Sequence, residues 1–226
     1  MTNTHNLNTK DISSLSHKDP QGIAVLLPCT DQARARQTAS ILNSRAGIDC
    51  QVFIIYDSLL QGFIKTINQV FARLDVRYLV YLAQDAYPGR GWLHCAYTCL
   101  ERTSKGLLAF NDGKWHGRIA SFGMVRTSWV KTLYNGNFFY PGYKSHAADL
   151  ELTVIAQALG EHVYNPNCTL VEIDSNKDKG GSNPEDHNLF LFRVKQCFDG
   201  LVEQDELDAL DLQYRIEMRV PDLSQE

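Results

Sequence analysis

The sequence predicts an α/β protein in which a mixed, mostly parallel β-sheet is flanked by helices and followed by a C-terminal helical extension. Short apolar runs alternate with segments of helical spacing three times in the first hundred residues, which is typical of a parallel sheet covered by helices. The runs are continuous, as in strands that are buried on both faces. A chain of 226 residues, 44% hydrophobic and 21% charged, can bury one sizeable core.

The first half of the chain holds the regular alternation. Residues 1–21 are polar and are expected to form a flexible leader. Thr30 or Asp31 is expected to cap the first helix, and Gly47 ends it. The elements expected after the leader are a strand at 23–27, a helix at 32–45, a strand at 51–56, a helix at 62–74 and a strand at 78–83.

The alternation changes in the second half. A turn at 111–114 lies between two apolar runs, which predicts an antiparallel excursion of the sheet. The segment 135–143 is loop-like and aromatic, and its side chains either stack on a sugar or base or pack the loop onto the core. The other expected elements are helices at 92–102, 128–134, 189–198 and 203–212, a helix that ends at 159, and strands at 106–110, 119–125, 163–164 and 168–173.

The expected organisation is a main domain at 22–195 and a helical extension at 196–226. The net charge of −4 leaves no basic stripe dedicated to a nucleic-acid backbone. The apolar runs are too short for a transmembrane segment, and the start of the chain lacks the apolar segment of a signal peptide, so a soluble cytoplasmic protein is expected. The six cysteines lie singly, with no second pair to complete a zinc site, and buried reduced thiols are expected.

One acidic residue stands out at the end of the third strand. Asp85 follows six apolar residues, and Pro88, Gly89 and Gly91 then break the chain before a helical pattern begins at Trp92. In open α/β sheets, ligands bind beyond the carboxyl ends of the strands. The carboxylate therefore either caps the following helix or serves as the acidic ligand of a metal-bound phosphate.

Four segments taken together resemble the nucleotide-sugar transferases of family 2, which have the Rossmann-like GT-A fold. The resemblance covers about residues 22–174 and includes a donor-side segment at 123–129. It departs from the family pattern at several positions, because Cys29 stands where threonine is usual, Tyr56, Ala83 and Gln84 stand at positions that are commonly acidic, and Ala148 replaces the acid before Asp149. The four segments are 25–31, 54–58, 82–93 and 148–152.

The resemblance implies an inverting glycosyltransferase that moves a sugar from a nucleoside-diphosphate sugar to an acceptor hydroxyl. Asp149 would act as the general base. Asp85 would hold Mn²⁺ or Mg²⁺, with His187 or, less favoured, His116 completing the shell. Pro28, Thr30, Asp57 and Gln84 would contact the nucleotide. The segment 174–187, with Lys177 and Lys179, is expected to be a mobile lid, and its basic residues, or Arg118 and Arg126, would meet the phosphates.

Other functions stay open from the sequence. The departures at Ala83, Gln84 and Ala148 are compatible with a catalytically degenerate nucleotide-sugar-binding protein. A nucleotidyltransferase is less favoured, because such enzymes tend to place a glycine-rich phosphate loop after the first strand and residues 28–32 contain no glycine. The same absence disfavours a dinucleotide-dependent oxidoreductase. The acceptor, whether a glycan, a small molecule or a macromolecule, is not identified.

Overall fold

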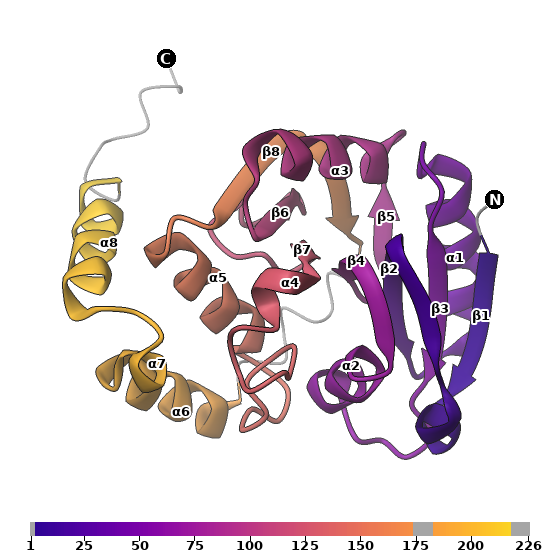
Figure 1. Ribbon diagram of the computed structural model, residues 1–226, viewed down its shortest axis with the longest axis horizontal. Helices are drawn as coiled ribbons and strands as arrows, with labels where there is room; N and C mark the ends of the chain where they lie inside the picture. Colours follow the sequence, from indigo (N-terminus) through magenta and orange to yellow (C-terminus); the bar gives the residue numbers. More distant parts are fainter. Residues whose placement is uncertain (1–2, 174–182, 218–226) are drawn as a thin grey trace.

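The computed structural model describes residues 3–173 and 183–217 of the chain. Within these residues, eight strands form one curled sheet with helices on both faces (Figure 1). The strands are β1 (Asn3–Asn8), β2 (His17–Cys29), β3 (Gln51–Tyr56), β4 (Leu74–Tyr81), β5 (Ala86–Pro88), β6 (Leu107–Asn111), β7 (Gly123–Arg126) and β8 (His162–Glu172). The helices are the 3₁₀ helix η1 (Thr9–Ser14), α1 (Gln32–Arg45), α2 (Phe63–Phe71), α3 (Trp92–Thr103), α4 (Thr127–Val130), α5 (Ala148–Ala158), α6 (Pro184–Lys195), α7 (Cys197–Gly200) and α8 (Gln204–Glu217).

The sheet is mixed and mostly parallel in its first half, as predicted. The strand order is β1-β3-β2-β4-β7-β6-β8-β5, and the first four strands are parallel neighbours. Strand β7 pairs antiparallel with both β4 and β6, so the expected antiparallel excursion is confirmed. Strand β8 is parallel to β6 and antiparallel to the short strand β5. The carboxyl ends of β2, β3, β4, β6 and β8 therefore meet at one edge of the sheet.

Strand β4 is apolar at successive positions because both of its faces are covered. Leu79 and Tyr81 face a core cluster that also contains side chains of α2 and α5, whereas Tyr78 and Val80 face a second cluster that contains side chains of α1 and α3. Successive side chains of a strand point to opposite faces, so a strand covered on both sides must be apolar at every position. All four side chains are fully buried.

The N-terminal segment differs from the flexible leader expected at 1–21. Residues 3–8 form the edge strand β1, η1 follows, and β2 begins at His17. The polar composition suits an edge strand, because one side of it faces solvent. The ring of His5 stacks on Phe53 with 4.7 Å between the ring centroids, a contact that no local sequence pattern indicates.

The aromatic loop at 135–143 packs onto the core. Phe138 and Phe139 are fully buried, and the side chain of Asn68 on α2 bonds their main chain. The amide nitrogen of Asn68 donates to the Phe139 carbonyl (3.0 Å), and its oxygen accepts from the Phe138 and Phe139 N–H groups (3.1 and 2.8 Å). Of the two possibilities for this loop, core packing applies to these two rings.

Several boundaries in the second half also differ from expectation. The strands expected at 163–164 and 168–173 are one strand, β8, with a register irregularity where it pairs with β6. The helix expected at 189–198 begins at Pro184, where Asn183 caps it, and ends at Lys195. The central part of the expected lid, with Lys177 and Lys179, lies outside the described residues. None of the helices in the described part of the chain is long and apolar enough to cross a membrane.

Candidate active site

A pocket of about 550 Å³ opens at the carboxyl edge of the sheet. This volume lies in the range of small-molecule sites, and the position is the one at which open α/β sheets bind ligands. The lining combines aromatic rings with two carboxylates, an ammonium and an imidazole. The residues that define it are Phe63, Ile64, Ala83, Lys114, Trp115, Ser121, Phe122, Phe139, Ser145, His146, Ala147, Ala148, Asp149 and Glu172.

Asp149 reaches this pocket from the first turn of α5. The residue before the helix, Ala147, has a left-handed backbone (φ 66°), which turns the chain sharply into the helix. One carboxylate oxygen of Asp149 accepts the N–H of Leu150 at 3.0 Å. Burial raises the pKa of Asp149 above its usual range, and the negative charge of Glu172 raises it further. The structure thus places the predicted base in the pocket, with a carboxyl group that holds its proton more readily than an exposed one.

The second carboxylate of the pocket, Glu172, was not singled out from the sequence. It is the last residue of β8 and pairs in register with Ala86, directly after Asp85. The signal that drew attention to Asp85, an acid at the carboxyl end of a strand, is present at Glu172 as well. It was missed because β8 was expected to extend to residue 173.

The loop before α5 is fixed by a buried acid on α6. The carboxylate of Asp186 accepts the N–H groups of Lys144, Ser145 and His146, each at 2.8 Å. Burial alone would raise the pKa of Asp186, but these backbone donors outweigh it and hold the pKa below its usual value. Ser145 and His146 line the pocket, so α6 determines the position of one of its walls.

Another wall carries a partly exposed aromatic ring. Trp115 is 38% exposed, and the Lys114 ammonium lies 5.3 Å from the centroid of its ring. The buried carboxylate of Asp112 accepts the N–H groups of both residues, at 2.9 Å from Lys114 and 2.8 Å from Trp115. Its other oxygen accepts the Ser121 hydroxyl at 2.6 Å. A ring held in this way offers an apolar face next to polar groups, a combination that suits a sugar.

The residues predicted to bind the nucleotide lie at the ends of β2, β3 and β4. The side-chain oxygen of Gln84 accepts the N–H groups of Thr30 and Asp31, both at 3.1 Å, so it links the loops after β2 and β4. Asp57 uses its carboxylate for the loop before α2, since it accepts the N–H groups of Gln61 (3.1 Å) and Gly62 (2.8 Å). The main chain joins the two strand ends through the Asp57 N–H and the Cys29 carbonyl (2.9 Å). Pro28, the next-to-last residue of β2, is buried.

Asp85 lies beside the pocket, and its side chain is 1% exposed. Its carbonyl accepts the N–H of Ile173 at 3.1 Å, which brings its main chain next to the end of β8. Ala83, two residues earlier, lines the pocket. The structure therefore brings the chain at Asp85, Glu172 and Asp149 to the same edge, although the Asp85 carboxylate is not part of the pocket lining described above.

The acids at this edge are suitable donors for Mg²⁺ or Mn²⁺, because both ions prefer oxygen ligands. Within residues 3–173 and 183–217, however, no group of three His, Cys, Asp or Glu side chains is placed to hold a metal ion. His187 is an exposed residue in the first turn of α6. A metal held here would have to share one or two carboxylates with substrate phosphates, which is a common arrangement for Mg²⁺.

The Arg126 side chain binds groups at the end of α3. Its guanidinium donates to the Leu100 carbonyl at 3.0 Å and pairs with Glu101 at 3.5 Å, at the end of α3. The sequence-based expectation that it meets a phosphate therefore has no support in its contacts. Arg118 and His116 belong to the loop between β6 and β7.

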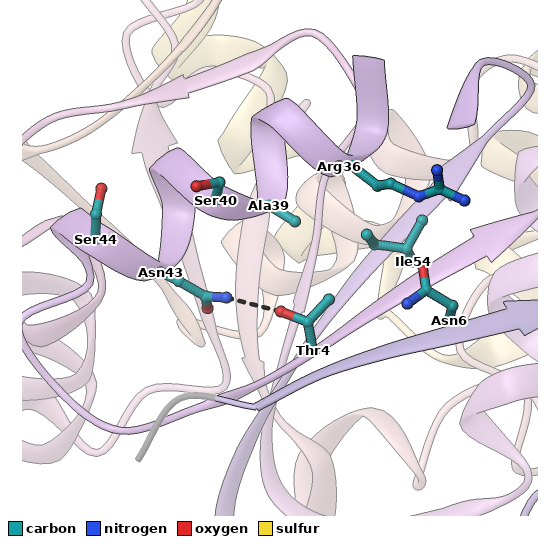
Figure 2. Close-up of a pocket in the computed structure, with 8 residues that line it drawn as sticks. All are labelled: Thr4, Asn6, Arg36, Ala39, Ser40, Asn43, Ser44 and Ile54. Carbon is teal, nitrogen blue, oxygen red and sulfur yellow. Dashed lines mark hydrogen bonds between the residues drawn. The ribbon is translucent and has the colours of Figure 1, made fainter. Parts of the chain in front are cut away.

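A second cavity, of about 490 Å³, lies between β1, β3 and α1 (Figure 2). Thr4 and Asn6 from β1 face Arg36, Ser40 and Asn43 from α1 across it, and the Asn43 amide donates to the Thr4 hydroxyl at 2.9 Å. No carboxylate lines this cavity among the residues that define it. It therefore offers no carboxylate base to a bound molecule.

No protein-family model matches the sequence, and no curated protein matches it. Solved structures do match in fold. A mannosyltransferase from Pyrobaculum calidifontis in complex with GDP-Man and Mn²⁺ has a TM-score of 0.54 at 10% identity, over 91% of this chain and 79% of that one. TarS from S. aureus has a TM-score of 0.54 at 14% identity, over 77% of this chain but only 40% of that one. A TarS 1–349 structure in complex with UDP also has a TM-score of 0.54 at 14% identity, over 70% of this chain and 62% of that one.

Proposed function

We propose, from the GT-A glycosyltransferase fold that this chain has, that it is an inverting glycosyltransferase that uses a nucleoside-diphosphate sugar. The observation that carries the proposal is the position of Asp149. A carboxylate with a raised pKa lies in a pocket at the edge of the sheet where such folds bind ligands. The sugar would pass to an acceptor hydroxyl, and the acceptor is not specified.

Asp149 acts as the general base. The acceptor oxygen forms a bond to the anomeric carbon from the face opposite the diphosphate, the bond from that carbon to the diphosphate breaks, and the hydroxyl proton moves to Asp149. This geometry inverts the anomeric configuration. A raised pKa brings the carboxylate closer to the pH at which it works, which improves proton transfer, while the Leu150 N–H holds one of its oxygens in place.

The other walls of the pocket bind the sugar. Trp115 and Phe63 provide apolar surfaces for the carbon face of a pyranose ring. Glu172 accepts hydrogen bonds from sugar hydroxyls through its carboxyl oxygens. Lys114 provides positive charge at the mouth of the same pocket, where a phosphate of the donor would be attracted.

The nucleoside binds beyond the ends of β2 and β3, where Pro28, Thr30, Asp57 and Gln84 lie. GDP-Man and UDP in the structures of similar fold support a nucleoside-diphosphate donor. Asp85 would hold a Mn²⁺ or Mg²⁺ ion together with the diphosphate oxygens, with His187 as a further ligand. When bound, such an ion supplies positive charge for the leaving diphosphate.

The replacement Asp149→Asn tests the base. It removes the proton acceptor while keeping the shape of the side chain, so UDP or GDP should still raise the melting temperature of the variant as it does for the wild type, whereas transfer from a UDP- or GDP-sugar should fall by at least about 10³-fold. The matched control is Asp75→Asn, an exposed acid on β4, which should leave both properties unchanged. Transfer retained by Asp149→Asn would eliminate Asp149 as the base.

The same measurements address a binding protein without turnover. The Gln84 side chain favours this second candidate, because it uses its oxygen to join two loops at a position where the related enzymes carry an acid. A wild-type protein that is stabilised by a nucleoside diphosphate but transfers no sugar from any donor would support this candidate.

A further inference from the structure

Three cysteines that are separate in the sequence meet where α3 packs on β8. Cys95 and Cys99 lie one turn apart on α3, and Cys168 lies on β8. The sulfur atoms of Cys95 and Cys168 are 2.7 Å apart. Unbonded carbon atoms pack at about 3.5–4.0 Å, so these two sulfurs are in closer contact than ordinary packing requires.

A cavity at the surface borders this pair on the Cys95 side. A cavity of about 410 Å³ is lined by Cys95 and Cys99 together with His94, Arg102 and Asn165. Cys95 is half-buried at this surface, whereas Cys168 is 0% exposed and lies behind it. A small reagent therefore meets Cys95 before Cys168, and Arg102 provides positive charge for an anionic one.

We propose that Cys95 and Cys168 form a reversible disulfide by exchange with a low-molecular-weight disulfide, such as oxidised glutathione, that enters this cavity. The assignment is independent of the sugar-transfer reaction. It concerns a pair of thiols that take no part in the pocket at Asp149.

The exchange proceeds in two balanced steps. Cys95 loses its proton and its sulfur attacks one sulfur of the small disulfide, which gives a mixed disulfide and releases one small thiol. Cys168 then loses its proton and attacks the Cys95 sulfur, which closes the protein disulfide and releases the second small thiol. Two protein thiols are oxidised and one small disulfide is reduced to two thiols.

The rate of the second step depends on the fraction of Cys168 that is present as thiolate. Burial raises the pKa of the Cys168 thiol, so little thiolate is present at neutral pH. The rate of closure should therefore increase as the pH rises. Contact with Cys95 compensates in part, because the attacking sulfur needs to move very little.

The cross-link would join α3 to β8 across 73 residues of chain. The segment that it encloses contains β6, β7 and α5. Strand β8 also pairs with β5, the strand directly after Asp85. A cross-link that closes a loop of this length lowers the conformational entropy of the unfolded chain. The oxidised form should therefore melt roughly 5–15 °C above the reduced form.

The test is performed on the full-length wild-type chain. The protein is incubated with oxidised glutathione at pH 8, remaining thiols are alkylated, and peptides are mapped by mass spectrometry without reduction. The expected result is a linked Cys95–Cys168 peptide, a fall from six alkylated cysteines to four, and reversal by dithiothreitol. Six alkylated cysteines after oxidation, or a link between other cysteines, would overturn the assignment.

Variants separate the pair from its neighbour. Cys95→Ser should abolish the linked peptide and the rise in melting temperature, whereas Cys99→Ser should retain both. Cys197→Ser, on the distant helix α7, is the matched control and should behave as the wild type. A rise in melting temperature that persists in Cys95→Ser would contradict the proposal, and the peptide map of the wild type decides the matter if a variant does not fold.

Discussion

At the scale of single residues, the pocket couples two carboxylates. Asp149 and Glu172 both line it, and the charge of Glu172 adds to the effect of burial in raising the pKa of Asp149. A base with a raised pKa becomes protonated, and inactive, at a higher pH than an ordinary aspartate. The acid limb of the pH–rate profile should therefore reflect the pKa of Asp149, including the part of it that is due to the charge of Glu172.

Glu172→Gln should shift this acid limb to lower pH. The substitution removes a negative charge near Asp149 and so lowers its pKa, which keeps the base ionised further into the acid range. The measurement is kcat/KM for sugar transfer as a function of pH, with the exposed Glu203→Gln as a control that should leave the limb in place. An unchanged limb, or a shift to higher pH, would show that Glu172 does not influence the base.

The sequence identified some residues of the site and missed others for physical reasons. Asp149 was found because an acid in the first turn of a helix is a local pattern that the resemblance supports. Asp186 and Asp112 were missed, because their roles depend on backbone N–H groups of loops whose course a local pattern does not define. Trp115 was missed because its exposure follows from how those loops fold.

At the scale of elements, a buried ion pair joins α5, the helix that carries the proposed base, to the C-terminal helices. The guanidinium of Arg193 on α6 binds both oxygens of Glu151 on α5, at 2.7 and 2.8 Å, and a third nitrogen binds Asp199 at 2.7 Å. Arg193 is 2% exposed and Glu151 is fully buried. The Tyr143 hydroxyl donates to the same carboxylate at 2.6 Å. The start of the expected extension at 196–226 is thus bonded to the main domain.

Arg193→Ala should lower the free energy of unfolding by about 3–5 kcal/mol, because it leaves the Glu151 carboxylate buried without its cation. The measurement is urea denaturation followed by circular dichroism. Lys144→Ala, which breaks the solvent-exposed pair with Glu185, is the matched control and should leave the unfolding free energy essentially unchanged. A loss of less than about 1 kcal/mol in Arg193→Ala would contradict a structural role for the buried pair.

Elements with start and stop signals in their own sequence were predicted well, and those that depend on pairing with a neighbour were not. Helix α1 coincides with its predicted range, and Asp31 caps it by accepting the N–H groups of Ala33 and Arg34. Strand β1 was missed because its polar residues gain their order from pairing with β3 along six positions. The residues of β1 themselves give no signal that predicts this pairing.

At the scale of the whole molecule, the sheet explains why distant acids meet. Asp85 follows β4, Glu172 ends β8 and Asp149 lies in the first turn of α5. Glu172 and Asp149 line one pocket, and the Asp85 carbonyl accepts the N–H of Ile173 next to the end of β8. The alternation of strands and helices predicted the fold class, and the solved structures of similar fold agree with it. The hydrogen-bond partners of each acid could be identified only from the structure.

The most direct test of the central claim is a crystal structure of the Asp149→Asn variant with an intact UDP- or GDP-sugar and Mn²⁺. The account predicts that the sugar lies in the pocket at Trp115 and Glu172, with its anomeric carbon facing residue 149 and the nucleoside beyond the ends of β2 and β3. A sugar bound away from residue 149, for example in the cavity between β1 and α1, would contradict the account.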